Sequence, residues 1–349
     1  MTLMWQRVVR SNFFIKLRSW EYWPFGIIQG PVFLYWLLLA LKERSIFFFS
    51  ASNPGILSGG MMGESKSEVL DLIPEEVKPK TVLVKLPATS SSVVRQMSVN
   101  GLSFPVIFKP DLGERGWMVR KITNEDDVVQ YLREIRINFV IQELVDLPLE
   151  FGVFFVHYPD KPTGRVTSIT MKQFLSVTGD GKSTLRELIL SIDRAKLQWG
   201  SLSLKFKDEL DEVLPAGETR ELVSIGNHCL GTTFLNANHL ITPKLNDSFN
   251  RISRSIKGFH FGRFDLRCAS LEDLENGKIK IVELNGCGAE PAHIYHPGAS
   301  FWTGMGTLFQ HVHNMYRVSV INHSMGVPYL SFQEGRAIYR KFKALKSGS

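Results

Sequence analysis

Two apolar stretches in the last third of the chain carry polar side chains where a strand would be expected to stay apolar. "GRFDLRC" holds Arg263 and Asp265 two residues apart, and "KIVELNG" holds Glu283 and Asn285 with the same spacing. Residues i and i+2 of a β-strand project to one face, so each pair shares a face. The interval between Asp265 and Glu283 is long enough for a loop between adjacent antiparallel strands. The sequence therefore predicts two neighbouring strands that direct these four side chains into one space.

The chemistry of this set indicates a magnesium site. Carboxylate and carboxamide oxygens are hard ligands, which Mg²⁺ prefers, usually alongside substrate phosphates. Asp265, Glu283 and Asn285 are therefore candidate ligands for one or two Mg²⁺ ions, with Mn²⁺ as a substitute. Arg263 would neutralise charge on a transferring phosphoryl group. Two other interpretations stay open, namely polar strand ends that meet water and a structural ion pair between Arg263 and Asp265.

Composition narrows the class of protein. A chain of 349 residues can bury a large core and divide into two or three subdomains. The three cysteines, Cys229, Cys268 and Cys287, are widely spaced, which argues against a disulfide framework or a zinc site and fits a reducing, cytoplasmic compartment. A formal net charge of +7 indicates anionic partners, and phosphate ligands or anionic lipid fit it. No long Lys/Arg run is present, so no nucleic-acid partner is predicted.

The N-terminal segment differs from the rest of the chain. Residues 1–20 contain Arg7, Arg10, Lys16 and Arg18 and no acid, and residues 23–41 contain no charge. That apolar stretch approaches the length of a spanning helix, but Pro and Gly residues interrupt it early, and no clear cleavage site of a signal peptide follows it. An interfacial anchor peripheral to the inner face of a membrane and a buried element or dimer contact remain level as interpretations. A true span ranks below both.

Beyond this segment the chain alternates between strands and helices. Residues 50–65, rich in Ser and Gly, predict a linker, and Thr123 with Asp126 predicts a capping box that opens a helix through Ile135. A loop is expected at Glu275–Gly277 and a basic helix at 335–346. The expected strands are 104–109, 117–122, 139–145, 150–156, 165–177, 259–268 and 278–285.

A lysine and a glycine-bearing turn form a second candidate site. Lys109 ends a predicted strand, and "PDLGERG" follows with Gly113 and Gly116. Backbone N–H groups of such a turn can approach phosphate oxygens, and the lysine adds a positive charge. The spacing is not that of a Walker A loop.

These motifs occur in an order that resembles the ATP-grasp superfamily. "FPVIFKPDLGERG", "FVIQELVDLPLEFGVFF", "GRFDLRC" and "IVELNG" are most similar to the D-alanine–D-alanine ligase and glutathione synthetase-like branch, and "TGDGKSTLRELI" is similar to a segment of cyanophycin synthetase. The resemblance implies an α+β ATP-grasp fold in which two α/β subdomains clasp ATP. It implies an N-terminal segment at 1–58, an ATP-grasp domain at 59–325 and a basic C-terminal helix and tail at 326–349.

The resemblance also implies roles for individual residues. Lys109 and, less directly, Lys66 would contact phosphates, and Glu150 would hold the ribose hydroxyls. Arg263 would face an acyl phosphate, and Asp265, Glu283 and Asn285 would hold magnesium. The turn that would close over the phosphates contributes Gly113, Arg115 and Gly116, the adenine slot comprises Gln142, Glu143, Leu144 and Val145, and further lysines near the nucleotide or substrate are Lys172 and Lys182.

Three departures from the family pattern stand out. An acid often starts the adenine stretch where this chain has Gln142, and the phosphate turn carries Glu114 and Arg115 in place of a small serine-bearing turn. The family's N-terminal α/β domain has no recognisable counterpart. D-alanine is therefore not the expected substrate.

The implied activity is that of an ATP-dependent carboxylate–amine ligase that works through an acyl phosphate and releases ADP and phosphate. Two alternatives stay open: an ATP-grasp kinase of a small hydroxylated substrate, and a non-catalytic, nucleotide-binding, membrane-associated protein. Neither the carboxylate nor the amine is identified by the sequence. No catalytic nucleophile is required, and Cys287 is expected to be a buried apolar residue. His293 and His296 are expected to be structural or to belong to a substrate loop.

Overall fold

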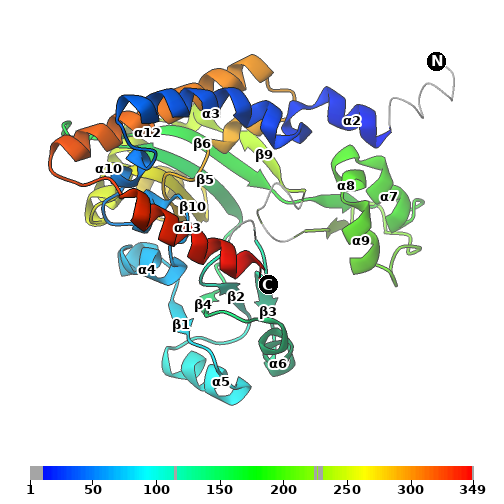
Figure 1. The fold of residues 1–349 in the computed structure, drawn as a ribbon. Coiled ribbons are helices and arrows are strands. Elements are labelled where there is room, and N and C mark those ends of the chain that lie inside the picture. Colours follow the sequence, from blue (N-terminus) through cyan, green and yellow to red (C-terminus); the bar gives the residue numbers. More distant parts are fainter. Residues whose placement is uncertain (1–10, 114–115, 224–225, 227–230, 348–349) are drawn as a thin grey trace.

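The computed structural model describes residues 11–113, 116–223, 226 and 231–347. Its class is α+β, as expected, with two antiparallel sheets that together carry the candidate site (Figure 1). The smaller sheet has the strand order β1-β4-β2-β3, with β1 at Thr81–Val84, β2 at Val106–Pro110, β3 at Arg120–Ile122 and β4 at Phe139–Glu143. Helices α5 (Ser90–Val99) and α6 (Glu125–Glu134) bury its apolar residues in a separate core.

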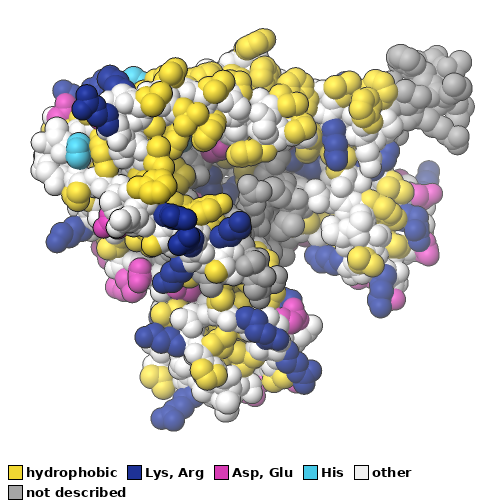
Figure 2. Space-filling model, viewed as in Figure 1, with side chains coloured by type: hydrophobic (Ala, Val, Ile, Leu, Met, Phe, Trp, Pro, Cys, Tyr) yellow, Lys and Arg dark blue, Asp and Glu magenta, His cyan; other side chains and the backbone are white. Residues whose placement is uncertain are grey.

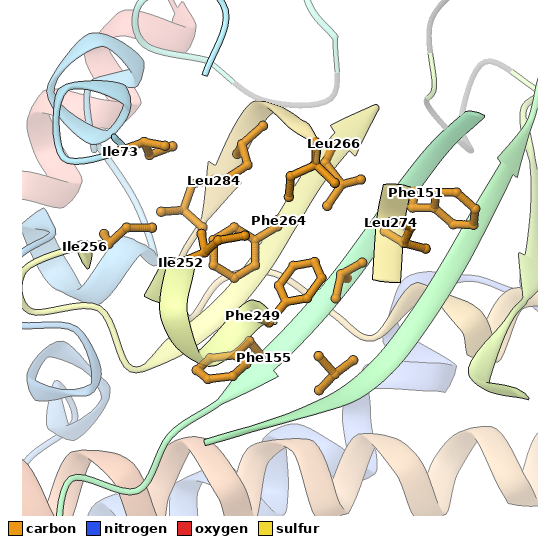
Figure 3. Close-up of a cluster of buried hydrophobic side chains, with 14 of the residues drawn as sticks. Ile73, Phe151, Phe155, Phe249, Ile252, Ile256, Phe264, Leu266, Leu274 and Leu284 are labelled. Carbon is orange, nitrogen blue, oxygen red and sulfur yellow. The ribbon is translucent and has the colours of Figure 1, made fainter. Parts of the chain in front are cut away.

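The larger sheet has the strand order β11-β10-β5-β6-β9. Its strands are β5 (Leu149–Val156), β6 (Arg165–Gln173), β9 (Thr233–Asn236), β10 (Phe261–Cys268) and β11 (Lys280–Asn285). One face is fully apolar and packs on α4 (Lys66–Asp71), α10 (Pro243–Ser255) and α11 (Leu271–Asn276). Figure 3 shows this core, in which Phe151 and Phe155 of β5 belong to the same buried cluster as Phe249 and Ile252 of α10.

The other face of the larger sheet is divided between a covered half and a charged half. Phe154, Val156 and Phe261 pack under α12 (Phe301–Ser324), which also packs against α3 (Phe25–Lys42). Further along the same strands, the alternate positions are charged or very small, beginning with Arg263 on β10 and Gly152 on β5. Helix α12 therefore covers only the apolar half of this face, and the charged half forms part of the candidate site.

A third unit lies to one side of the larger sheet (Figure 1). A two-stranded sheet of β7 (Ser176–Thr178) and β8 (Thr219–Glu221) packs with α7 (Leu185–Ser191), α8 (Asp193–Leu197) and α9 (Trp199–Lys205) around its own apolar core. Thr184 and Glu187 form a capping box at the start of α7. Arg194 of α8 pairs with Glu21 at 2.6 Å and so ties this unit to the N-terminal segment.

The N-terminal segment is helical and attached to the core. Helix α2 (Asn12–Arg18) begins at an N-cap serine, Ser11, and α3 continues through Pro31 without a break. The inner side of α3 is buried against α12, while α13 (Phe332–Ser347) follows α12 at the C-terminus. The buried-element interpretation is therefore correct for one side of α3, and the expected interruption by Pro and Gly is wrong.

Several expectations for individual elements are corrected by the structure. The proposed linker is largely buried, because residues 48–60 fold into two short 3-10 helices, η2 (Phe48–Ser52) and η3 (Leu57–Gly60), beneath α12. Helix α6 is capped by Asn124, whose side chain accepts from the Asp127 amide, and not by Thr123. The segment 165–177 forms two strands, and the predicted loop at Glu275–Gly277 is the end of α11, where Gly277 adopts the left-handed conformation.

Candidate active site

The predicted pairing of the two polar strands is confirmed. Strands β10 and β11 are antiparallel neighbours, with Arg263 opposite Asn285 and Asp265 opposite Glu283. The register shifts just after Asp265, at a bulge that leaves Val282 without a partner in the register, and pairing then continues with Leu266 opposite Ile281. Asn285 donates its amide N–H to Asp265 Oδ2 at 3.1 Å. All four predicted side chains therefore meet at one end of the larger sheet.

Asp265 lies at the centre of a buried charge network. Arg263 contacts both of its oxygens, with Nε and a terminal nitrogen each at 3.0 Å, and Lys172 Nζ lies 3.3 Å from Oδ1. The same lysine contacts Glu150 Oε1 at 3.0 Å, and Arg267 contacts Glu150 Oε2 at 2.9 Å. Two carboxylates thus alternate with three cations across β5, β6 and β10.

The protonation states follow from this arrangement. Burial alone would raise the pKa of Asp265, but Arg263 and Lys172 hold that pKa below its usual range. Burial opposes the charge of Lys172 as well, yet Asp265 and Glu150 raise the pKa of the lysine above its ordinary value. Asp265 and Lys172 are therefore both charged at neutral pH, and each of these buried charges is compensated by a partner.

A glycine explains how the arginine and the acid fit together. Gly152 of β5 pairs with Asp265 in the sheet, and a Cβ atom at Gly152 would lie 3.2 Å from both Arg263 Cδ and Asp265 Oδ1. Directly across β5, Thr170 of β6 pairs with Gly152, and its hydroxyl is buried with no hydrogen-bond partner among the described residues. Neither position was predicted as part of the site, because a glycine and a threonine in a strand carry no signal of function by themselves.

The smaller sheet contributes Lys109 from the opposite side. Lys109 Nζ donates to Gln142 Oε1 at 2.9 Å and to the Val282 carbonyl oxygen of β11, also at 2.9 Å. Burial lowers the pKa of Lys109 to about 8, against the raising effect of Glu283. The two sheets therefore meet at this lysine, beside the predicted magnesium ligands.

Lys66 reaches the same region from α4. Its Nζ lies 3.8 Å from Glu283 Oε1 and donates to the backbone carbonyl of Gly113 in the predicted phosphate turn. Asp111, at the start of that turn, accepts from the Ser65 hydroxyl and the Ser67 amide, each at 2.9 Å. These bonds fix the beginning of α4 against the turn, so the structure brings together the two lysines that the resemblance pairs.

The predicted adenine residues lie where the chain passes from the smaller to the larger sheet. Gln142 is buried, and its amide N–H donates to Val282 O at 3.3 Å while its oxygen accepts from Lys109. A carboxylate could not donate to that carbonyl, which accounts for glutamine at a position where an acid is often found. Glu143 is exposed and accepts from the Lys80 amide at 3.1 Å, and the Val145 carbonyl accepts from Arg267 at 3.0 Å.

The remaining predicted residues are only partly placed. Gly113 and Gly116 flank the phosphate turn, both with positive φ, but Glu114 and Arg115 lie outside the described residues, as does Cys229. Lys182 lies in the turn before α7, where its amide donates to Asp180. Cys287 is buried, as expected, and burial raises its pKa to about 12, which excludes a reactive thiolate.

The histidines of "PAHIYHP" contact other parts of the larger sheet. His293 Nδ1 and the Ser168 hydroxyl are 2.6 Å apart, and burial lowers the pKa of His293 to about 4. His296 Nδ1 accepts from the Asn236 amide of β9 at 3.2 Å. Both therefore attach the loop that follows β11 to the larger sheet, and a role of this loop in substrate binding stays a prediction.

The segment that was expected to be a linker supports the end of β11. Cys287 N donates to Gly59 O at 3.0 Å, and Gly288 N donates to Gly60 O at 2.9 Å. Gly60 packs so closely on Gly286 that a Cβ atom would lie 2.6 Å from the Gly286 Cα atom, and both Gly59 and Gly60 have positive φ. The run of glycines in "SGGMMG" could have revealed a close backbone approach, which sequence reasoning took for flexibility.

The predicted magnesium ligands supply hard oxygen atoms, and magnesium binding by them stays a prediction. Asp265 and Asn285 are in contact, and Glu283 is the register partner of Asp265, so the set holds two carboxylates and one amide. Both oxygens of Asp265 already contact Arg263. In the described part of the chain no three His, Cys, Asp or Glu side chains gather closely enough to hold a metal by themselves. A hard ion that takes its other ligands from water and phosphate is consistent with such a sparse set.

No protein-family model matches the chain, and no curated protein matches it. Similar solved structures include a D-alanine–D-alanine ligase from Bacillus anthracis (10% identity, TM-score 0.42, 77% of this chain and 70% of that chain) and VanG D-Ala:D-Ser ligase from Enterococcus faecalis (13%, 0.41, 73% and 62%). A bifunctional glutathione synthetase from Pasteurella multocida is also similar (14%, 0.37), and this chain spans only 38% of its length.

The resemblance predicted from the sequence names D-alanine–D-alanine ligases and glutathione synthetases, and solved structures of both are among those similar to this chain. The identities and TM-scores are low. The contacts within the site of this chain therefore carry the argument for its function.

Proposed function

We propose that this protein is an ATP-dependent carboxylate–amine ligase of the ATP-grasp type. One observation carries the proposal: the register of β10 and β11 sets Asp265 opposite Glu283 and Arg263 opposite Asn285, beside Lys109 of the smaller sheet and Lys66 of α4. Acidic and amide oxygens on one side and lysines on the other form a site with the charge pattern of a nucleotide phosphate chain and its metal.

Each part of the site has a distinct task in this proposal. Lys109 and Lys66 bind phosphate oxygens of ATP, and Glu150 accepts from the ribose hydroxyls. Asp265, Glu283 and Asn285 hold Mg²⁺, which supplies charge neutralisation at the phosphates when bound. Arg263 is fixed in direction by its two contacts to Asp265 and by donation to the Glu290 carbonyl oxygen at 3.2 Å, and it presents its other N–H groups to the acyl phosphate.

The proposed reaction has two steps. A carboxylate oxygen of the first substrate attacks the γ-phosphorus of ATP, the bond to the β–γ bridging oxygen breaks, and ADP leaves. The nitrogen of the second substrate then attacks the acyl carbon, phosphate leaves, and the amine loses a proton to form an amide. The protein supplies proximity and fixed charges, and no covalent enzyme intermediate is needed.

Hydroxylamine trapping tests this proposal. The purified protein is incubated with Mg²⁺, ATP and a panel of carboxylic acids, and hydroxylamine converts any acyl phosphate to a hydroxamate. A hydroxamate with matching ADP release identifies the carboxylate before its amine is known. Glu283→Gln protein is the control.

The alternatives predict different outcomes of the same assay. ADP release with a hydroxylated compound, without hydroxamate, would identify the kinase. ATP binding without ADP release from any pair of substrates would identify a non-catalytic nucleotide-binding protein. Either result would reject the ligase.

A further inference from the structure

Helix α3 exposes an apolar face that nothing in the described structure covers. Its inner side is buried through Ile28, Val32 and Leu39 against α12. The opposite side should be polar in a helix that meets only water. Instead Leu34, Leu38 and Leu41 are 64%, 64% and 74% exposed. The helix is thus apolar all round although it is buried on only one side.

The exposed face continues beyond one helix. We define the apolar strip as the exposed apolar residues of α2 and α3, which are Phe13, Leu17, Phe25, Ile27, Phe33, Leu34, Leu38 and Leu41. Figure 2 shows hydrophobic side chains along the upper edge of the molecule, where Figure 1 places α2 and α3. An exposed apolar surface of this extent marks an interaction site.

Charge at the two ends of the strip is positive. Lys16 and Arg18 precede α3 and Lys42 and Arg44 end it, all exposed, and no charged residue lies between Trp23 and Leu41. Lys42 also contacts the core, since its Nζ lies 5.4 Å from the centroid of the Tyr316 ring. The neighbouring acids are directed inward. Glu21 pairs with Arg194 at 2.6 Å, and Glu43 accepts from the hydroxyls of Tyr316 and Tyr329. The outward surface is therefore apolar in the middle and basic at its ends.

The attachment of α3 to the core decides its orientation. By length and composition, α3 is the one helix among the described residues that is apolar enough to cross a membrane. However, Gln29 donates to Glu290 at 2.6 Å, Tyr35 contacts His313 at 2.9 Å, and the Trp20 indole N–H donates to Ala299 O at 2.8 Å. A spanning helix would have to break these bonds and expose its buried side. Lying flat preserves them.

We propose that α2 and α3 dock this protein on an anionic bilayer surface, with α3 parallel to the membrane plane. Leu34 and Leu38 enter the boundary between headgroups and acyl chains, to a depth of roughly 5–10 Å. Lys16, Arg18, Lys42 and Arg44 contact anionic headgroups at the two ends. Residues 1–10, which carry Trp5, Arg7 and Arg10, precede the strip but lie outside the described residues. This proposal is independent of the ligase chemistry.

The charge pattern favours a bilayer over a second copy of the chain. A two-fold contact between two α3 helices would bring the basic ends of one against the basic ends of the other, in either helix direction. Such like-charge contacts oppose association, whereas anionic headgroups favour all four cations at once.

Vesicle co-sedimentation of the full chain tests the docking. Wild-type protein should sediment with phosphatidylcholine vesicles that contain phosphatidylglycerol, and binding should weaken with salt and with loss of the anionic lipid. Leu34→Glu/Leu38→Glu should weaken binding at least tenfold without a change in melting temperature, because both side chains are exposed. Lys16→Ala/Arg18→Ala should weaken it less and reduce the salt dependence.

Matched controls isolate the strip from general surface effects. Val99→Glu on α5 and Leu204→Glu on α9 make the same kind of change at residues that are 78% and 76% exposed elsewhere, and both should bind as wild type does. Light scattering without vesicles tests whether a second copy of the chain binds to the apolar strip. A dimer that dissociates in Leu34→Glu/Leu38→Glu, with no vesicle binding by either protein, would overturn the proposal. So would equal sedimentation of wild type and that variant.

Discussion

The larger and the smaller sheet form two walls of the proposed nucleotide site, and the buried charges of these walls are compensated in different ways. On the larger sheet, Asp265 and Glu150 are bound by Arg263, Lys172 and Arg267, so the cations and anions of that wall satisfy one another. On the smaller sheet, Lys109 donates to an amide and a backbone carbonyl, neither of which carries a full charge. The pKa of Lys172 is accordingly raised, and that of Lys109 is lowered to about 8.

This difference indicates which wall changes most when a ligand arrives. The network on the larger sheet is already ordered, which suits groups that must be preorganised for a transition state. Lys109 has a buried charge without a full counter-charge in contact, so a phosphate would relieve a cost that the free protein bears.

Replacing Glu283 should abolish most turnover. Glu283→Gln keeps the size of the side chain and removes its charge, so a magnesium ligand becomes a weaker neutral donor. We expect ADP release to fall about 10²- to 10³-fold, as for loss of one electrostatic group in an active site, while the fold survives. Activity within a few-fold of wild type would remove Glu283 from the metal site.

Replacing Asp265 should also cost stability, which Glu283→Gln should not. The Asp265 side chain is 5% exposed and that of Glu283 is 36% exposed. Asp265→Asn leaves Arg263 and Lys172 buried with one compensating charge fewer, at a cost of about 3–5 kcal/mol in unfolding free energy. Urea unfolding of both variants measures the contrast. Equal losses would mean that the buried network does not stabilise the larger sheet.

Lys109→Ala should weaken ATP binding more than it weakens the fold. A charge-assisted hydrogen bond contributes about 1.5–3 kcal/mol, which corresponds to a Kd roughly 10- to 100-fold higher. Removing a buried charge with no full counter-charge should not destabilise the free protein by the same amount. Titration calorimetry with a non-hydrolysable ATP analogue gives the affinity. An unchanged Kd would mean that Lys109 does not bind phosphate and has a structural role.

The affinity for ATP should fall above pH 8. The pKa of Lys109 is about 8 in the free protein, and bound phosphate would raise it, because phosphate favours the charged form. Below pH 8 the lysine is already protonated and contributes no pH dependence. Above pH 8 binding must take up a proton, so affinity should decline by up to about tenfold per pH unit. Calorimetry in buffers of different ionisation enthalpy measures the proton uptake, which Lys109→Ala should lack.

Local patterns in the sequence were sufficient for the chemistry of β10 and β11. Arg263 with Asp265 and Glu283 with Asn285 follow the period of a strand, and alternation fixes which side chains share a face. The same kind of reasoning predicted strands at 104–109 and 139–145, where the structure has β2 and β4. It succeeded because the deciding interactions lie within one element or between near neighbours in the chain.

Reasoning from the sequence failed where distant segments share a backbone surface. Residues 50–60 have the composition of a linker, yet Asn53 bonds to Phe261 and Gly60 packs on Gly286, more than two hundred residues away. Glycine and serine predict flexibility only when nothing packs on them. Here their small size permits close contact between two chain segments, which only the tertiary structure reveals.

The sequence by itself determined the α+β class, the polar pairs on β10 and β11, Lys109 at the end of β2, and the apolar and basic character of the N-terminal segment. The tertiary structure decided what those features face. It set Lys109 against Val282, placed Gly152 beneath Arg263 and Asp265, and buried one side of α3 while leaving the other exposed. The reason is physical: side-chain alternation is a property of a single strand or helix, whereas burial and charge compensation depend on which elements pack together.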